Sequence, residues 1–180
     1  MITNDKINYF YNFLNQKELK ELFNLVDNIS WGKFVTDIPG QPKYASHLCH
    51  TLIDSTKGVK PKEKILNVIL KKIQEHYKCE YLPHNLYLNY YRFGDEIRVH
   101  QDRNTNKKNK TFIFYCTKQW DLNWHGNTLF YSQDSSTIIG GSVPYPNTGV
   151  CFDSDILHTS DPISKNCLEK RIILVYQLES

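Results

Sequence analysis

Residues 86–102 read LYLNYYRFGDEIRVHQD, and this stretch decides how we interpret the rest of the chain. Apolar and polar residues alternate over its first six positions, which is the pattern of a half-buried β-strand. The Gly-Asp pair in the middle indicates a turn, after which we expect a second strand over 96–102. Side chains of a strand repeat every two residues, so Arg98, His100 and Asp102 are expected to share one face. An imidazole and a carboxylate on one face are two candidate metal ligands.

The composition of the 180 residues fits one soluble globular domain spanning 1–180. A formal net charge of +3 is too small to indicate nucleic-acid binding. Five cysteines without C-x-x-C spacing favour a reducing cytoplasm, and the N-terminus lacks the pattern of a secretion signal. No apolar run approaches the roughly 20 residues that span a bilayer, so a membrane protein is disfavoured.

The first 83 residues have the pattern of a mainly helical support. A helix is expected to begin at Asn15 or Gln16, where apolar residues start to recur at helical spacing. A second helix is expected over 61–79, with a proline in its first turn. The segment 31–60 contains glycines and prolines and is expected to be irregular, with a short strand near 34–36.

From residue 84 onward, short apolar segments alternate with turn residues. We expect strands near 84–92, 96–102, 111–117, 127–131, 136–139, 149–153, 156–159 and 170–178. Eight strands with polar turns are typical of a barrel or a two-sheet jelly roll over 84–180. The segment 104–110, NTNKKNK, is interpreted as a solvated hairpin loop or as a lid over a substrate.

A third candidate ligand comes from the last third of the chain. His158 ends the segment GVCFDSDILH and follows Asp102 by 56 residues. Two histidines and one carboxylate on one side of a metal form the facial triad of non-haem Fe(II) oxygenases. Such a triad leaves octahedral positions for a bidentate keto acid and for dioxygen. Each histidine taken alone is better explained as structural, so the prediction depends on the joint pattern.

A negatively charged keto acid requires a fixed cation, and Arg171 is a candidate. It opens the segment RIILVYQLE, in which it shares a strand face with Ile173, Val175 and Gln177. A buried guanidinium is normally paired with a carboxylate, and no obvious partner stands on that face. Arg171 therefore has the properties of a residue that binds an anionic co-substrate.

Together these residues resemble the 2-oxoglutarate and Fe(II)-dependent dioxygenases, and the finer pattern is similar to their prolyl 4-hydroxylase branch. The supporting segments are YRFGD at 91–95, FIFYCTKQWDLNWHGNTLFY at 112–131 and RIIL at 171–174. The family's strand-Trp-x-x-x-x-Gly-x-x-Leu signature is similar to Trp120, Gly126 and Leu129 here. The resemblance covers about 87–178. It implies an α+β fold, a double-stranded β-helix or cupin-like jelly roll with the N-terminal helices packed on one sheet.

The resemblance also assigns roles to single residues. It implies an iron site made of His100, Asp102 and His158. Arg171 would bind the distal carboxylate of 2-oxoglutarate, helped by the hydroxyl of Tyr115. Tyr91, or Tyr90 if the register differs by one, would lie near the iron-bound end, and Asn89 shares the face of Tyr91.

Other positions are open to more than one interpretation. The loop before the candidate arginine is longer than expected for the prolyl hydroxylase branch, so Lys165 or Lys170 could anchor 2-oxoglutarate instead. Arg98 could contact an anionic substrate or pair with nearby acidic residues, and Trp120 could be a substrate platform or a core aromatic. Gln177 is a candidate substrate contact at a position where related nucleic-acid demethylases tend to place a second arginine, which disfavours a nucleic-acid substrate.

The implied function is that of an enzyme. With Fe(II) and O2 it would convert 2-oxoglutarate to succinate and CO2 while hydroxylating a prolyl or another side chain in a peptide or protein. Ascorbate is a candidate further cofactor. One alternative is a 2-oxoglutarate oxygenase that acts on a free amino acid, another small molecule or a nucleobase. An alternative from another class is a non-catalytic jelly roll that serves as a binding module. The sequence makes no prediction of the oligomeric state.

Overall fold

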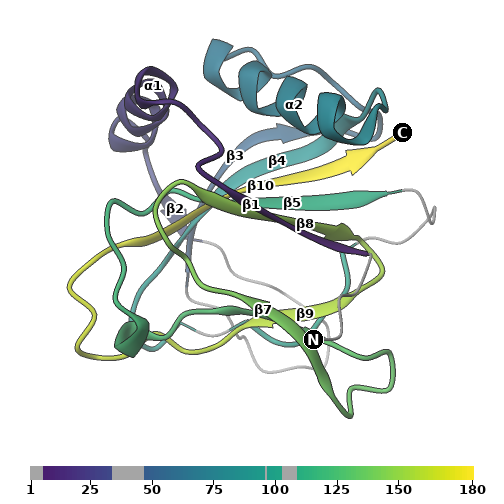
Figure 1. Ribbon diagram of the computed structural model, residues 1–180. Coiled ribbons are helices and arrows are strands. Elements are labelled where there is room, and N and C mark those ends of the chain that lie inside the picture. The colour runs from purple at the N-terminus through teal and green to yellow at the C-terminus, as the bar shows by residue number, and fades with distance from the viewer. Residues whose placement is uncertain (1–5, 34–46, 96, 103–108) are drawn as a thin grey trace.

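In the computed structural model, the described residues form two antiparallel β-sheets and two α-helices (Figure 1). It describes residues 6–33, 47–95, 97–102 and 109–180. The short strand expected near 34–36 lies outside the described residues, as does most of the loop at 104–110. Both helices lie above one face of the larger sheet, and the smaller sheet lies below the opposite face.

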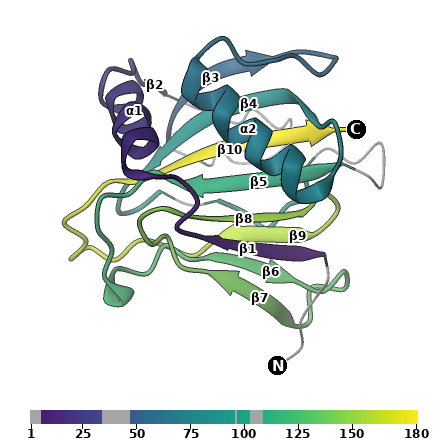
Figure 2. The same cartoon turned by 45° about the horizontal axis from the view of Figure 1, so that its top comes forward.

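The larger sheet has the strand order β1-β8-β5-β10-β4-β3-β2, and the smaller sheet has the order β7-β6-β9 (Figure 2). The bounds of the larger sheet's strands are β1 Ile7–Tyr11, β2 Gly32–Lys33, β3 Leu48–Asp54, β4 Leu82–Tyr91, β5 Lys110–Tyr115, β8 Thr148–Asp153 and β10 Arg171–Glu179. Those of the smaller sheet are β6 Thr128–Tyr131, β7 Ile138–Ser142 and β9 Leu157–Ser160. A single 3-10 turn, η1 Leu122–Trp124, precedes β6. This two-sheet arrangement confirms the predicted α+β jelly roll with helices on one sheet.

The two faces of the larger sheet contact different partners because side chains alternate along each strand. On β10, Leu174 and Tyr176 are buried beneath the helices together with Leu66 of α2, Lys64–Tyr77. Ile173 and Val175 of the same strand belong to a second apolar cluster that faces the smaller sheet. One face of the sheet is therefore a helix-covered core, and the other is available for a site between the sheets.

Helix α1, Gln16–Asp27, begins where the sequence predicted. The side chain of Asn15 accepts a hydrogen bond from the backbone of Glu18 at 3.0 Å, and the Glu18 carboxylate accepts one from the backbone of Asn15 at 2.8 Å. This reciprocal capping box satisfies two amide groups that would otherwise have no partner at the helix start.

Replacing the cap, Asn15→Ala, is expected to destabilise the fold by about 1 kcal/mol without changing activity, because Asn15 lies far from the space between the sheets. The melting temperature should fall by roughly 2–4 °C in a protein of this size. Lys20→Ala, an exposed substitution in the same helix, is the matched control. Equal melting temperatures for the two variants would show that the cap contributes nothing.

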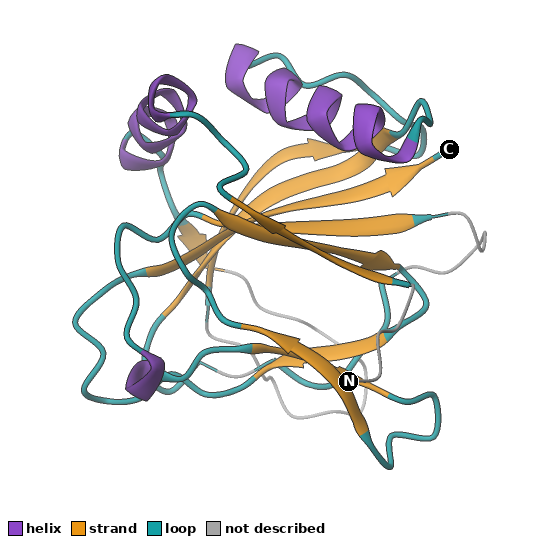
Figure 3. Cartoon of the chain, in the orientation of Figure 1, coloured by secondary structure: helices purple, strands orange, loops and turns teal. Residues whose placement is uncertain are grey.

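The prediction for the first part of the chain was incomplete. Besides α1 and α2, its described residues form the strands β1, β2 and β3. Figure 3 shows the strands in orange and the helices in purple. β3 comes from the segment that was expected to be irregular, and β1 is a short apolar run that becomes regular by pairing with β8 at the sheet edge. Both strands depend on partners that are distant in the sequence, so local patterns carry little sign of them.

The strand predicted over 96–102 was wrong. Among the described residues of this segment, only His100 pairs with another strand, through an isolated bridge to His158 of β9. The imidazole Nδ1 of His100 lies 2.8 Å from the carbonyl of Arg98. This carbonyl therefore bonds a side chain two residues away instead of the backbone of a neighbouring strand. Arg98, His100 and Asp102 nevertheless all line the same cavity, as the strand pattern required.

Candidate active site

The candidate metal ligands meet between the two sheets. The backbones of His100 and His158 exchange hydrogen bonds of 3.0 and 2.9 Å, which places the two imidazoles side by side with ring centroids 4.3 Å apart. Asp102 lies 3.9 Å from His100 Nε2 and 3.8 Å from His158 Nε2. One donor atom from each residue lies within 4.8 Å of the other two, which is close enough for a single metal ion.

Each imidazole is held in the orientation that a metal ligand needs. His100 Nδ1 lies 2.8 Å from the Arg98 carbonyl, and His158 Nδ1 lies 3.0 Å from the Ile156 carbonyl. A carbonyl only accepts, so each Nδ1 carries the proton and each Nε2 keeps a free lone pair toward Asp102. Burial lowers the pKa of His158, and the neighbouring His100 lowers it further although Asp102 opposes the shift. The lowered pKa favours the neutral imidazole, which is the form that coordinates a metal.

The carboxylate of Asp102 is fixed by two neighbours that the sequence analysis did not assign to it. The hydroxyl of Thr111 on β5 donates to one carboxylate oxygen, and the Gln177 amide on β10 donates to the other at 2.8 Å. Gln177 in turn accepts a hydrogen bond of 3.1 Å from Asn85 on β4. Hydrogen bonds of this kind orient a carboxylate toward a metal. The observed role of Gln177 is therefore to contact Asp102 rather than to be free for substrate.

Removing this support, Gln177→Leu, is expected to weaken Mn(II) binding by about 10–100-fold, the usual effect of losing a hydrogen-bond partner of a metal ligand. Mn(II) is an oxygen-stable substitute for Fe(II), and its free concentration can be followed by electron paramagnetic resonance. Gln16→Leu, an exposed change at the start of α1, serves as the control. An unchanged Mn(II) affinity in Gln177→Leu would show that Gln177 does not support the metal site.

A buried cation lies at the other side of the same cavity. Arg171 is only 1 % exposed; its Nε donates to the Gly126 carbonyl at 2.6 Å and its Nη2 to the Thr128 hydroxyl at 3.3 Å. Nη1 has no hydrogen-bond partner, and no ion pair joins the guanidinium to a carboxylate within the described part of the chain. Burial lowers the pKa of Arg171, but a guanidinium stays protonated in proteins. A buried, protonated guanidinium with an unpartnered Nη1 is suited to bind an anionic ligand.

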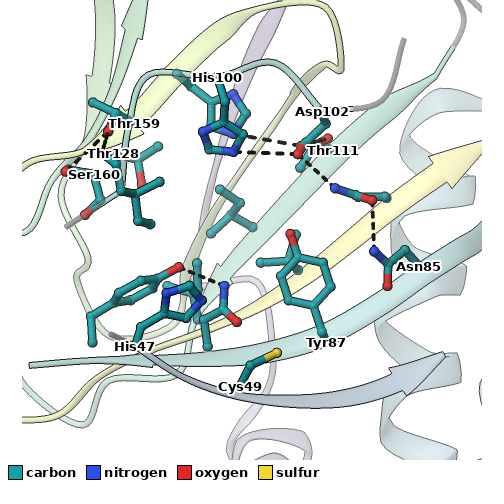
Figure 4. A pocket seen from close by; sticks show the side chains of 18 of the residues that line it. His47, Cys49, Asn85, Tyr87, His100, Asp102, Thr111, Thr128, Thr159 and Ser160 are labelled. Atoms are coloured by element: carbon teal, nitrogen blue, oxygen red, sulfur yellow. Dashed lines mark hydrogen bonds and ion pairs between the residues drawn. The ribbon is translucent and has the colours of Figure 1, made fainter. Parts of the chain in front are cut away.

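The cavity that joins these groups has a volume of about 530 Å³ and lies between the two sheets. Figure 4 shows Thr128 at one side, His100 and Asp102 in the middle, and Asn85 at the opposite side. The cavity thus offers an anion-binding end, a metal-ligand cluster and a further polar end, in that order.

The family profile of the 2OG-Fe(II) oxygenase superfamily matches residues 86–177, about half of the chain. The chain belongs to the 2OG-Fe(II) oxygenase superfamily. The matched segment contains the three candidate metal ligands and Arg171. The protein is therefore a 2-oxoglutarate-dependent dioxygenase, and the non-catalytic binding module considered from the sequence is set aside.

Solved structures of this superfamily share the fold at low sequence identity. A Burkholderia pseudomallei oxidoreductase of the 2OG-Fe(II) oxygenase family matches with a TM-score of 0.73 and 14% identity, covering 97% of this chain and 85% of that one. A Pseudomonas putida prolyl-4-hydroxylase gives 0.66 and 11%, with 97% and 93% covered. A Trichoplax adhaerens prolyl hydroxylase bound to a hypoxia inducible factor peptide fragment gives 0.63 and 13%, with 97% and 84% covered. A comparison with curated proteins found no match.

The oxygenase's residues fit the groups that the family name implies. Two neutral imidazoles and one carboxylate are the donor set of non-haem Fe(II). The unpartnered Nη1 of Arg171 fits a carboxylate of 2-oxoglutarate.

Neither described helix has the length and hydropathy to cross a membrane.

Two tyrosines surround the guanidinium of Arg171. The ring of Tyr91 lies 5.0 Å from it and that of Tyr115 lies 6.0 Å from it, which allows cation–π attraction in a buried setting. The Tyr91 hydroxyl accepts a hydrogen bond of 2.7 Å from Asn89, and the Tyr115 hydroxyl donates one of 2.8 Å to Thr128. Burial raises the pKa of both phenols, so they remain neutral hydrogen-bonding groups.

The conformation and surroundings of Gly126 show why the Trp-x-x-x-x-Gly signature has a glycine at this position. Its φ of +73° is in the left-handed region, and a side chain there would come within 3.1 Å of both Arg171 and Trp120. Its carbonyl accepts the hydrogen bond from Arg171 Nε, and Trp120 donates a hydrogen bond of 3.0 Å to His125. Trp120 therefore packs behind the arginine and does not line the cavity, which excludes it as a substrate platform in this conformation.

The positions of the residues correct two further alternatives and leave the prediction for Arg98 open. Tyr90 lies on the opposite face of β4, packed against Trp31 at a centroid distance of 5.7 Å, so its side chain cannot reach the cavity. Lys165 and Lys170 are exposed and do not line the cavity, whereas Arg171 does. Arg98 lines the cavity from an exposed position.

Proposed function

We propose that this oxygenase uses Fe(II), 2-oxoglutarate and O2 to hydroxylate a prolyl or another side chain of a peptide or protein, with succinate and CO2 as co-products. The observation that carries the proposal is the pairing, in one cavity, of a His-Asp-His cluster with a buried arginine that has no ion pair among the described residues. In this proposal His100, Asp102 and His158 hold the iron, and Arg171 holds the distal carboxylate of 2-oxoglutarate.

Each residue then has a distinct task. Bound iron and 2-oxoglutarate would supply the oxidising power, which the protein directs but does not itself provide. Arg171 holds the co-substrate. Tyr115 does not itself line the cavity; its hydroxyl donates to Thr128, which does, and so supports this end. Tyr91 and Asn89 form a hydrogen-bonded wall beside the co-substrate. The carbonyls behind both histidines keep the Nε2 lone pairs directed inward. Apolar residues of β5 and β10 between these groups, Ile113 and Ile173, keep water away from the co-substrate.

The peptide or protein substrate is proposed on two grounds. Two of the structures that share the fold are prolyl hydroxylases, and one of them is bound to a peptide fragment. In addition, the exposed side chains of Asp54 and Arg98 line the cavity, so a side chain attached to a larger molecule can enter. A free amino acid, another small molecule or a nucleobase stays an alternative without a specific feature in its favour. Ascorbate binding and a cytoplasmic location stay predictions.

The direct test is succinate formation from 2-oxoglutarate with Fe(II) and O2, measured alone and with pools of short peptides. We expect a slow iron-dependent reaction without peptide and a faster one with an accepted peptide, whose mass increases by one oxygen atom. Omission of Fe(II) is the control. Absence of succinate under all conditions would overturn the proposal.

A further inference from the structure

The cavity extends past the metal-ligand cluster, away from Arg171. Arg171 and Gln177 lie on the same face of β10 six residues apart, which corresponds to about 20 Å along a strand. Gln177 contacts Asp102, and Asn85, its partner in register on β4, lies beyond it. If 2-oxoglutarate fills the side toward Arg171, the substrate group meets the side formed by Asn85 and its neighbours.

The hydrogen bonds at this end fix which atom Asn85 presents. Gln177 donates through its NH2 group to the Asp102 carboxylate and accepts through its carbonyl oxygen from Asn85. Asn85 therefore donates with its own NH2 group. The direction of each amide follows from this chain of bonds. Among the described residues no donor reaches the carbonyl oxygen of Asn85, so this oxygen can accept a hydrogen bond from another molecule.

Asp54 adds a negative charge beside this acceptor. It is the cross-strand neighbour of Asn85 on β3, it lines the cavity and it is exposed to solvent. Within the described ranges it has no ion pair. Arg98 also lines the cavity and has an interaction of its own.

Tyr87 completes the end of the cavity. Figure 4 shows it below the metal-ligand cluster, with its hydroxyl directed toward His100 and Asp102. Its aromatic ring can attract a cation, and its phenol stays neutral because burial raises its pKa. A carboxylate, an amide oxygen and an aromatic ring are together suited to a donor-rich positive group and offer little to a negative one.

We propose that Asp54, Asn85 and Tyr87 form a subsite for a cationic nitrogen group of the substrate, the ammonium or guanidinium of a lysine- or arginine-like side chain. This inference rests on the proposed function, because it assumes that 2-oxoglutarate occupies the Arg171 end. The cavity then has opposite charges at its two ends, which directs the co-substrate and the substrate group to different places. Within the proposed function this selects a cationic side chain over a prolyl one.

The test uses the full chain loaded with Mn(II) and 2-oxoglutarate, so that no turnover occurs. N-acetyl-lysine N-methylamide and its uncharged analogue N-acetyl-norleucine N-methylamide are titrated into it by calorimetry. The lysine compound is expected to bind at least about tenfold more tightly, the factor that hydrogen bonds to a charged group provide. In Asp54→Asn the two affinities should come within about threefold of each other.

Asp27→Asn, which changes an exposed carboxylate on α1, is the matched control and should keep the full preference for the lysine compound. Equal affinities in the wild type, tighter binding of norleucine, or no binding of either compound to the loaded protein would overturn the subsite. These outcomes leave the proposed function standing. Failure of Mn(II) and 2-oxoglutarate to bind in the first place would overturn both.

Discussion

Asp102→Ala is expected to abolish 2-oxoglutarate turnover and to weaken Mn(II) binding by more than about a hundredfold. The reason is that losing even a hydrogen-bond partner of a ligand typically costs 10–100-fold, and here the ligand itself is lost. The remaining imidazoles of His100 and His158 would hold the metal without a charge to balance it. Turnover is followed by succinate formation, and metal affinity by electron paramagnetic resonance.

The substitution should leave the fold in place, because Asp102 lies in a cavity and not in either apolar core. Circular dichroism checks this, and Asp27→Ala on α1 is the control for loss of a carboxylate elsewhere. Succinate formation at the wild-type rate by a folded Asp102→Ala protein would show that Asp102 is not a metal ligand.

Arg171→Gln is expected to weaken 2-oxoglutarate binding by about 3–5 kcal/mol, or roughly 10²–10⁴-fold, the usual cost of removing one partner of a buried ion pair. Mn(II) affinity should change little, because no contact joins the guanidinium to the candidate metal ligands. Calorimetric titration of 2-oxoglutarate into the Mn(II)-loaded protein measures the effect.

The chain provides its own controls for this variant. Lys170→Gln and Lys165→Gln remove exposed positive charges from the loop that leads into β10, and neither should change the affinity for 2-oxoglutarate. A large loss of 2-oxoglutarate affinity in Lys170→Gln, together with wild-type affinity in Arg171→Gln, would show that Lys170 and not Arg171 is the anchor.

Much of the candidate site could be predicted because strand side chains alternate. The alternation in residues 86–91 correctly separated Leu86 and Leu88, which pack under the helices, from Asn89 and Tyr91, which face the cavity. The same rule placed Tyr115, on the neighbouring strand β5, on the sheet face of Arg171. It also implied that Tyr90 would face away, so the alternative register was the weaker one.

Contacts between strands that are distant in the sequence could not be predicted in this way. Gln177 was interpreted as a substrate contact because nothing local indicates that it meets Asp102, which lies 75 residues away. Thr111 shares the cavity face with Ile113, and this parity is a signal that could have identified it. Asn85 could have been found by the same parity, but its role follows only from the hydrogen bond to Gln177.

Calorimetric titration of Mn(II) and then 2-oxoglutarate into the wild-type protein and into His158→Ala tests the central claim most directly. We predict one Mn(II) per wild-type chain, a 2-oxoglutarate affinity that rises when the metal is present, and loss of both in His158→Ala. Tight binding of metal and 2-oxoglutarate by a folded His158→Ala protein would contradict the site described above, as would failure of the wild type to bind either one.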